Sequence, residues 1–346
     1  MKSTMKAKAS KTPGSSKDSI LLHRDQVPSM QIEPYIITGY RQPGTSVLGS
    51  IRYAFVLHND VGNFWTHFLP LLAWVAWLAW LAKYRIDFTD PYYYPLLCFW
   101  AGACSYVLFS SMAHLLSNIS FTVRSVCFTL DYLGIALYAL GGAISGFFYE
   151  QSIGSPLFKY QGLVLSLDVA IAISATLMCG LTRFYWRNFR YLIRAFSFVF
   201  PYATAVAPFI QRLFVCLLTG NECVTETLHL HVSGFFLTFT IAFFFVSKIP
   251  ERFAPGRFDI YFQSHQLFHV VAVVQTCTQM YMFPLDAQLR KDALSVVEGA
   301  TPNIYNTLLP FMFAEVVGIV IASVVGVLIV RGVLVYDEKQ HYSKTK

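Results

Sequence analysis

The sequence predicts an all-α, polytopic membrane helical bundle, and three observations support this fold class. The chain has 346 residues, of which 55% are hydrophobic and only 13% are charged, whereas a soluble globular domain carries roughly a quarter charged residues. Eight stretches are apolar over the ~20 residues that a helix needs to cross a bilayer. These stretches lack the period-two pattern of membrane barrel strands, so we expect helices, which satisfy their own backbone hydrogen bonds in lipid.

The expected spans divide the chain into four parts. We place the spans near residues 64–82, 95–116, 126–148, 161–181, 195–218, 228–247, 262–283 and 307–330. The parts are a cytosolic basic N-terminal tail with a juxtamembrane segment (1–60), a seven-span core (61–283), an outer loop with an eighth span (284–332) and a cytosolic C-terminal tail (333–346).

Charge in the connections predicts the orientation of these spans. With the N-terminus in the cytosol, 20 of the 26 Lys and Arg residues fall in inner segments and six in outer ones. Cytosolic connections carry the excess of Lys and Arg in membrane proteins. The N-terminal stretch MKSTMKAKASKTPGSSK has no apolar core and is therefore not expected to be a signal peptide. With an even number of spans, both termini lie in the cytosol.

Cysteine usage predicts at most one disulfide. Most of the seven cysteines lie inside apolar runs, and no CxxC pair occurs. Cys216 and Cys223 are the two that lie close enough to a loop to suggest a disulfide. No zinc ribbon or disulfide framework is indicated.

Three expected spans place their polar side chains at one depth of the membrane. Ser110 and His114 end the second span, Asp131 follows the start of the third, and His265 and His269 lie in the first two turns of the seventh. At about 1.5 Å per residue, all five lie within roughly 10 Å of the expected inner surface. Ionisable groups inside a membrane are costly, so such a coincidence indicates a functional site.

The residue types in this group predict a zinc site. His265 and His269 share one helical face at positions i and i+4, so they can offer two imidazoles to one ion, and His114 makes three. Three histidines with one open position are typical of catalytic zinc. Asp131 could orient a bound ligand or accept a proton. Each histidine taken alone also fits a buried residue with a neighbouring partner.

The remaining polar groups leave alternatives open. The Ser110 hydroxyl lies one turn before His114 and either assists the site or bonds to its own helix. His229 and His231 begin the sixth span on the opposite side, where we expect an interfacial pair. The HxxxH pair lacks the glutamate of HExxH, so the sequence does not favour a soluble-type metalloprotease.

Four sequence pieces resemble the progestin and adipoQ receptor family, most closely its gamma-type membrane progestin receptors. They are HNDVGNFWTHFLP at the first span, SSMAH ending the second, FTLDYLG opening the third and PERFAPGRFDIYFQSHQLFHV leading into the seventh. The pieces run in the family's order from about residue 35 to residue 283. The resemblance implies a seven-helix zinc-containing core, with zinc held by His114, His265 and His269 and with Asp131 close by, plus an eighth C-terminal helix.

The first piece departs from the family at one position. The family usually has glutamate where this chain has Asp60, whereas Asn63 and His67 are retained. Aspartate is one methylene shorter, so a hydrogen bond from its carboxylate could differ. The resemblance implies that this motif braces the N-terminal segment against the bundle.

The resemblance implies functions of different classes. One is a plasma-membrane steroid (progestin) receptor that signals at its cytosolic face, with a partner such as a G protein. The second is a zinc-dependent, ceramidase-type hydrolase of a sphingolipid amide, with Asp131 and Ser110 as catalytic residues, because zinc can make water nucleophilic at neutral pH. The third is a purely structural metal site. No nucleic-acid partner is expected.

Overall fold

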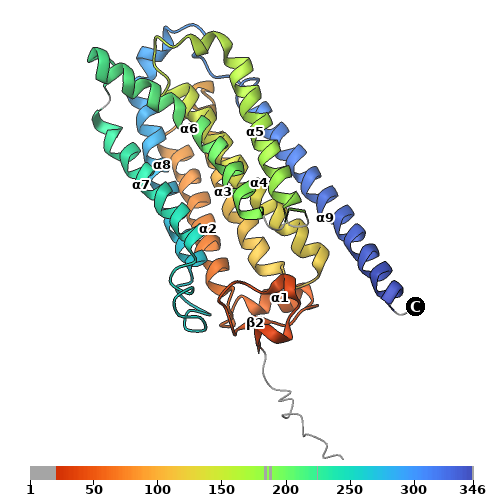
Figure 1. Ribbon diagram of the computed structural model, residues 1–346. Helices are drawn as coiled ribbons and strands as arrows, with labels where there is room; N and C mark the ends of the chain where they lie inside the picture. Colours follow the sequence, from red (N-terminus) through yellow and green to blue (C-terminus); the bar gives the residue numbers. More distant parts are fainter. Residues whose placement is uncertain (1–20, 183–184, 187–188, 224, 345–346) are drawn as a thin grey trace, which may run out of the picture.

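A bundle of long helices forms the body of the protein (Figure 1). This computed structural model describes residues 21–182, 185–186, 189–223 and 225–344. The basic stretch predicted at the start of the chain, residues 1–20, lies outside the described residues. The predicted all-α class is confirmed, since strand is confined, in the described part of the chain, to one two-residue pair.

Eight long helices follow a short N-terminal segment. That segment contains β1 (Leu21–Leu22), β2 (Tyr40–Arg41) and helix α1 (Val47–Tyr53), and β1 and β2 pair antiparallel. The long helices are α2 (Val61–Tyr84), α3 (Tyr94–Leu116), α4 (Phe121–Tyr149), α5 (Gln161–Leu181), α6 (Arg190–Thr219), α7 (Thr225–Ser247), α8 (Ser264–Ser295) and α9 (Leu308–Lys344). Short 3-10 turns cover Arg24–Gln26, Ser29–Gln31, Pro91–Tyr93 and Pro156–Tyr160.

Seven of the described helices are long and apolar enough to cross a membrane, namely α2 to α7 and α9. The prediction of eight such spans is corrected at one place, because α8 is not among them. Helix α8 is the longer helix that replaces the expected span 262–283, and it packs beside α7 and contacts α2 and α4. Several of its polar side chains are enclosed by the bundle, among them Gln266, His269 and Gln275, which are all buried. Hydropathy averaged over the helix therefore understates how much of it the bundle encloses.

The interior of the bundle is centred on α3 and α4. Leu96, Phe99 and Trp100 of α3 and Leu137 and Phe148 of α4 are fully buried in one apolar cluster. Large side chains on α6 and α7, by contrast, are exposed at the periphery of the bundle. This is the arrangement expected when lipid covers the outer surface, since hydrophobic side chains need no shielding there.

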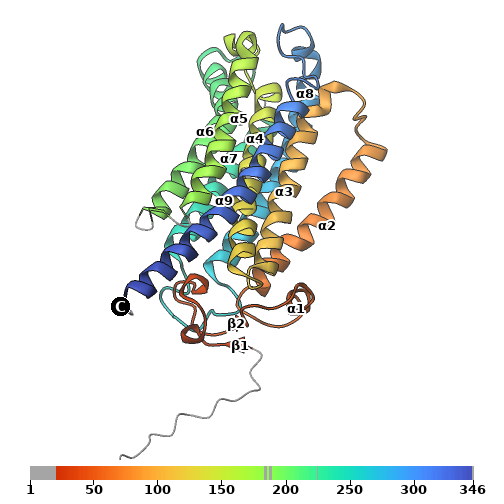
Figure 2. The same ribbon diagram turned by 90° about the vertical axis from the view of Figure 1, so that its right-hand side faces the viewer.

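The N-terminal segment folds across one end of the bundle, which we call the N-terminal end (Figure 2). Asp259, in the connection between α7 and α8, accepts backbone hydrogen bonds from Ile37 (3.1 Å) and Thr38 (2.7 Å). The Thr38 hydroxyl donates to the same carboxylate at 2.6 Å. These contacts bring Arg41 against α3, where its guanidinium donates to the carbonyls of His114 and Leu115.

The opposite end, which we call the far end, holds the predicted disulfide. Cys216 and Cys223 are bonded with their Cα atoms 5.0 Å apart, which confirms the prediction from the sequence. This bond joins the last turn of α6 to the connection that leads into α7. Helix α9 runs back from the far end and finishes at the N-terminal end (Figures 1 and 2).

Candidate metal centre

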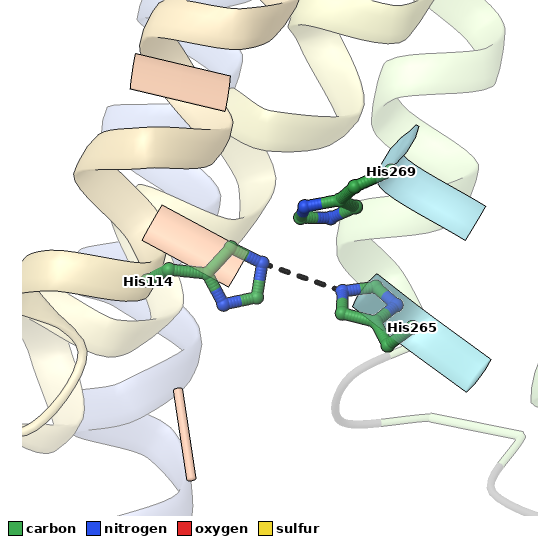
Figure 3. A group of neighbouring side chains, drawn as sticks. All are labelled: His114, His265 and His269. Carbon is green, nitrogen blue, oxygen red and sulfur yellow. Dashed lines mark hydrogen bonds between the residues drawn. The ribbon is translucent and has the colours of Figure 1, made fainter. Parts of the chain in front are cut away.

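Three histidine rings converge at the N-terminal end of the bundle (Figure 3). His114 comes from the last turns of α3, and His265 and His269 come from the first two turns of α8. The Nε2 atoms of His114 and His265 lie 3.3 Å apart. One ring nitrogen from each histidine lies within 4.8 Å of the other two. His114 and His269 are buried and His265 is half-buried, so the group is enclosed but reachable.

The outer nitrogens of two of these rings have defined partners. His114 Nδ1 lies 2.8 Å from Asp60 Oδ1, so it carries the hydrogen and donates to the carboxylate. His269 Nδ1 lies 3.1 Å from the Thr66 hydroxyl oxygen, which itself donates to the Gly62 carbonyl. Because Nδ1 is occupied in both rings, the lone pair of Nε2 is left for another atom. Such partners set the tautomer and orientation of metal-binding histidines.

Asp60 joins the N-terminal segment to the histidine group. Its Oδ2 atom accepts from the Arg41 guanidinium at 3.0 Å, and its Oδ1 atom accepts from the Asn63 amide at 2.8 Å as well as from His114. Burial alone would raise the pKa of this carboxyl, but His114, Arg41 and Asn63 together outweigh burial and hold the pKa well below its usual range. Asp60 is therefore an anion that accepts three charge-assisted or polar hydrogen bonds.

The start of α8 is fixed by a buried carboxylate. Glu251 accepts a hydrogen bond from the backbone nitrogen of Ser264 at 2.8 Å and another from the Ser264 hydroxyl. Gln263, the residue before the helix, donates to the carbonyls of Asn59 and Asp259. A carboxylate at a helix N-terminus satisfies free backbone N–H groups and suits the helix dipole. These bonds place His265 and His269 at a defined height beside α3.

The histidine group fits a zinc ion by the chemistry of its donors. Three imidazoles from two helices are a donor set that Zn²⁺ takes in sites that keep a fourth position open. Two of the rings present Nε2 toward the group with Nδ1 hydrogen-bonded outside it, as zinc-binding histidines do. Buried imidazole nitrogens that face one another at 3.3 Å are also poorly paired unless a proton or a metal lies between them.

Comparison with known proteins assigns the chain to a family. The family model described as "Haemolysin-III related" matches residues 55–280. This range contains α2 to α7 and the two histidines of α8. The chain belongs to the Haemolysin-III related family.

Curated relatives in this family carry the name of membrane progestin receptors. Membrane progestin receptor gamma of Homo sapiens is 33% identical over 307 residues, which cover 87% of this chain and 88% of that protein. Membrane progestin receptor delta of Homo sapiens is 33% identical over 81% of this chain and 83% of its own. Membrane progestin receptor alpha of Mus musculus is 31% identical over 82% of each. The family's receptors therefore match this protein over most of its length.

A fourth histidine of this family member stacks on the group. The His67 ring of α2 lies parallel to the His269 ring, with centroids 3.7 Å apart, and meets the edge of Tyr106 at 5.4 Å. Neither ring nitrogen of His67 has a hydrogen-bond partner among the described residues. His67 covers the face of His269 and supplies no nitrogen to the three-histidine group.

The other predicted site residues, Asn63, Ser110 and Asp131, lie on α2, α3 and α4. Asn63 is buried and contacts Asp60, as described above. Ser110 is buried on α3, one turn before His114. Asp131 is half-buried in α4 and does not belong to the set of ligand atoms gathered within 4.8 Å.

Sequence reasoning missed two residues that hold the histidines in place. Thr66 contacts His269, and Arg41 contacts both Asp60 and the end of α3. Thr66 lies inside HNDVGNFWTHFLP, one of the pieces that carry the family resemblance, whereas Arg41 lies upstream of that piece. Thr66 precedes His67 and lies three residues after Asn63. Its place in this motif could therefore have marked it as a residue of the site. Arg41 gave no signal of its pairing, which depends on how the N-terminal segment folds back.

Proposed function

We propose that this protein is a plasma-membrane receptor for a progestin-type steroid, with a zinc ion near the cytosolic face. The observation that carries the receptor assignment is the 33% identity to membrane progestin receptor gamma of Homo sapiens over 87% of the chain. The alignment covers 88% of that receptor, so the likeness extends beyond a single motif. The apolar helices agree with an integral, multi-pass protein.

Zinc is the metal that we assign to the three-histidine group. His114, His265 and His269 would hold the ion. Asp60 would fix the tautomer of His114, and Thr66 would fix that of His269. A bound zinc ion supplies Lewis acidity and one open coordination position. It would also join α3 to α8, two helices that are about 150 residues apart in the sequence.

Charge and the disulfide both support a cytosolic N-terminus. We place the N-terminus in the cytosol because the connections at the N-terminal end carry most of the Lys and Arg residues. The Cys216–Cys223 disulfide lies at the far end, and disulfides persist in oxidising compartments rather than in the cytosol. A signalling partner such as a G protein would then meet the N-terminal end, close to the histidine group.

A binding assay tests the steroid assignment. Membranes from cells that express the full chain should bind a radiolabelled progestin saturably, and an unlabelled progestin should displace it. Membranes with an equal amount of an unrelated multi-pass protein serve as the control, and cholesterol serves as a competitor of similar size. Binding that never saturates, or that cholesterol displaces equally well, would contradict a progestin receptor.

A zinc-dependent hydrolase of a ceramide-like lipid is the second candidate function. It is favoured by the donor set, because three histidines leave a position for a reacting group. We assign proton transfer to Asp131 and a supporting hydroxyl to Ser110. Asp131→Asn should then lower the release of sphingosine from ceramide by at least about 100-fold, the scale of general acid–base catalysis, while zinc content stays unchanged. Asp87→Asn, in an exposed connection at the far end, is the matched control. Zinc-loaded wild type that releases no sphingosine would exclude this function.

A further inference from the structure

A second group of buried ligand-type side chains lies at the far end of the bundle. Glu150 follows α4, His231 lies in α7 and Asp286 lies in α8. Their exposed fractions are 2%, 7% and 0%, and one ligand atom of each lies within 4.8 Å of the others. Asp286 comes 17 residues after His269 on the same helix, about 26 Å along its axis. The group is therefore separate from the three histidines.

Two members of this group are held in fixed orientations. Asp286 Oδ1 accepts from the Thr227 hydroxyl at 2.9 Å and lies 3.6 Å from the Arg212 guanidinium, while Oδ2 lies 3.0 Å from His231 Nε2. The His231 ring stacks on Phe209, with centroids 3.8 Å apart and planes 7° from parallel. One Asp286 oxygen and His231 Nε2 are thus directed to the same point by contacts outside the group. The prediction that His231 forms an interfacial pair with His229 is wrong for this reason, because His231 is enclosed by α4, α6 and α8.

Glu150 is the member with an oxygen that lacks a hydrogen bond. Its Oε1 atom is buried and makes no hydrogen bond with any described residue. The closest polar atom that forms a pair with it is His231 Nε2, at 3.8 Å. A buried carboxylate oxygen without hydrogen bonds is costly unless a cation or a proton meets it. One carboxylate oxygen of Glu150 lies within 4.8 Å of the ligand atoms of both His231 and Asp286.

The two arginines nearby pair with other carboxylates, although Arg212 Nη1 is buried and has no hydrogen-bond partner among the described residues. Arg290 donates to the carbonyls of Tyr149 and Gln151 and pairs with Glu222 at 3.4 Å. Arg212 pairs with Asp286, as described above. Neither arginine forms an ion pair with Glu150 in the described part of the chain. The Glu150 carboxylate is therefore left for another cation.

We propose that Glu150, His231 and Asp286 form a second metal site, which takes a divalent ion such as Zn²⁺. Ligand atoms about 2.0–2.1 Å from a tetrahedral zinc ion lie roughly 3.3–3.4 Å from one another, and the separations of 3.0 Å and 3.8 Å at His231 Nε2 lie on either side of that value. An imidazole with two carboxylates suits zinc better than calcium or magnesium, which prefer oxygen ligands alone. The ion would tie α4, α7 and α8 together at the far end. This site does not depend on the proposed function.

Counting bound metal tests the second site. The full chain, purified in detergent, is stripped with a chelator, reloaded with Zn²⁺ alone, freed of loosely bound ion and analysed for zinc per chain. We expect two ions in the wild type, one in Glu150→Gln, one in His265→Ala and none in the double variant. Glu315→Gln, a carboxyl-to-amide change in α9, is the matched control and should retain two. Size-exclusion chromatography checks that each variant is folded.

The outcomes separate the two sites. A wild type with one ion that His265→Ala removes and Glu150→Gln keeps would overturn the second site. Retention of two ions in Glu150→Gln would overturn it as well. A wild type with one ion that Glu150→Gln removes would support the second site and reject zinc at the three histidines. If Glu150→Gln does not fold, His231→Gln replaces it in the same assay. The proposal is still overturned if the wild type holds a single ion and His265→Ala loses that ion.

Discussion

Asp60 is the residue on which the arrangement of the histidine group depends most. One oxygen of its carboxylate accepts from His114 Nδ1 at 2.8 Å, and the other accepts from Arg41 at 3.0 Å. A single side chain thereby links the N-terminal segment, the start of α2 and the end of α3. The aspartate side chain is long enough to reach both partners.

Replacing Asp60 by asparagine should weaken zinc binding without unfolding the bundle. The amide oxygen accepts a weaker hydrogen bond from His114, and the ion pair with Arg41 is lost. Partners of this kind typically contribute about 10- to 100-fold to metal affinity, so we expect a loss of that size in a competition titration against a chromophoric chelator. Asp292→Asn, on an exposed part of α8, controls for the loss of one charge. An unchanged affinity in Asp60→Asn would show that this carboxylate does not support the ligand.

At the scale of helices, the position of His114 depends on how closely α3 approaches α4. A Cβ atom at Gly134 would lie 2.5 Å from the Tyr106 Cα atom, and one at Gly102 would lie 2.5 Å from the Leu137 carbonyl oxygen. Small residues allow such close contact of helices in membranes. The α3–α4 pair is therefore a rigid support for the end of α3 that carries His114.

Gly134→Ala should separate these two helices and destabilise the protein. The new methyl group meets backbone atoms, which cannot rotate away, so a cost of about 1–3 kcal/mol is expected from overpacking. The melting temperature in detergent measures it. Gly234→Ala in α7 is the matched control, because nothing lies within 4 Å of its added Cβ, and alanine favours a helix. Equal melting temperatures for the two variants would contradict the close approach.

The first turns of α8 are polar although the bundle encloses most of them. Ser264, His265, Gln266 and His269 lower the apolar character of this helix, and each of them except the half-buried His265 is buried against other parts of the protein. Polar groups at that depth are tolerated because they bind one another or the bundle. The sequence located both histidines correctly on one helical face but could not show which neighbours enclose them.

At the scale of the molecule, the two polar groups lie at opposite ends of one bundle. The three histidines lie at the N-terminal end with the positively charged connections, and the group around Asp286 lies at the far end with the disulfide. Helix α9 returns to the N-terminal end, so the described C-terminal residues lie at the same end as the N-terminal segment (Figure 2).

Protease accessibility should reveal this orientation. Epitopes added to the N-terminus and to the C-terminus should be digested only after cells are permeabilised, because positive charge retains both ends in the cytosol. An epitope inserted after Val296, which is 85% exposed in the far-end connection, should be digested in intact cells and is the control. Digestion of the terminal epitopes in intact cells would reverse the proposed orientation.

Most of the fold could be predicted from the sequence because the signal is local. Long apolar runs, loop charge and the Cys216–Cys223 pair each depend on residues close together in the chain, and each needs only the bilayer or the compartment as context. The HxxxH spacing placed His265 and His269 on one face for the same reason. The end of α8 at Ser295 was not predictable in this way, since polar residues after the expected end of the span, such as Asp286 and Arg290, end the apolar run without ending the helix.

The sequence by itself determined the helical class, the positions of most spans and the kinds of side chain that could bind a metal. Only the tertiary structure decided which of these side chains meet: that Asp60 and Thr66 hold His114 and His269, that Arg41 returns to Asp60, and that Glu150 joins His231 and Asp286. The physical reason is that these contacts join residues from 19 to 203 positions apart in the chain. Helical periodicity predicts the face on which a residue lies, but the packing of one helix against another determines its partner.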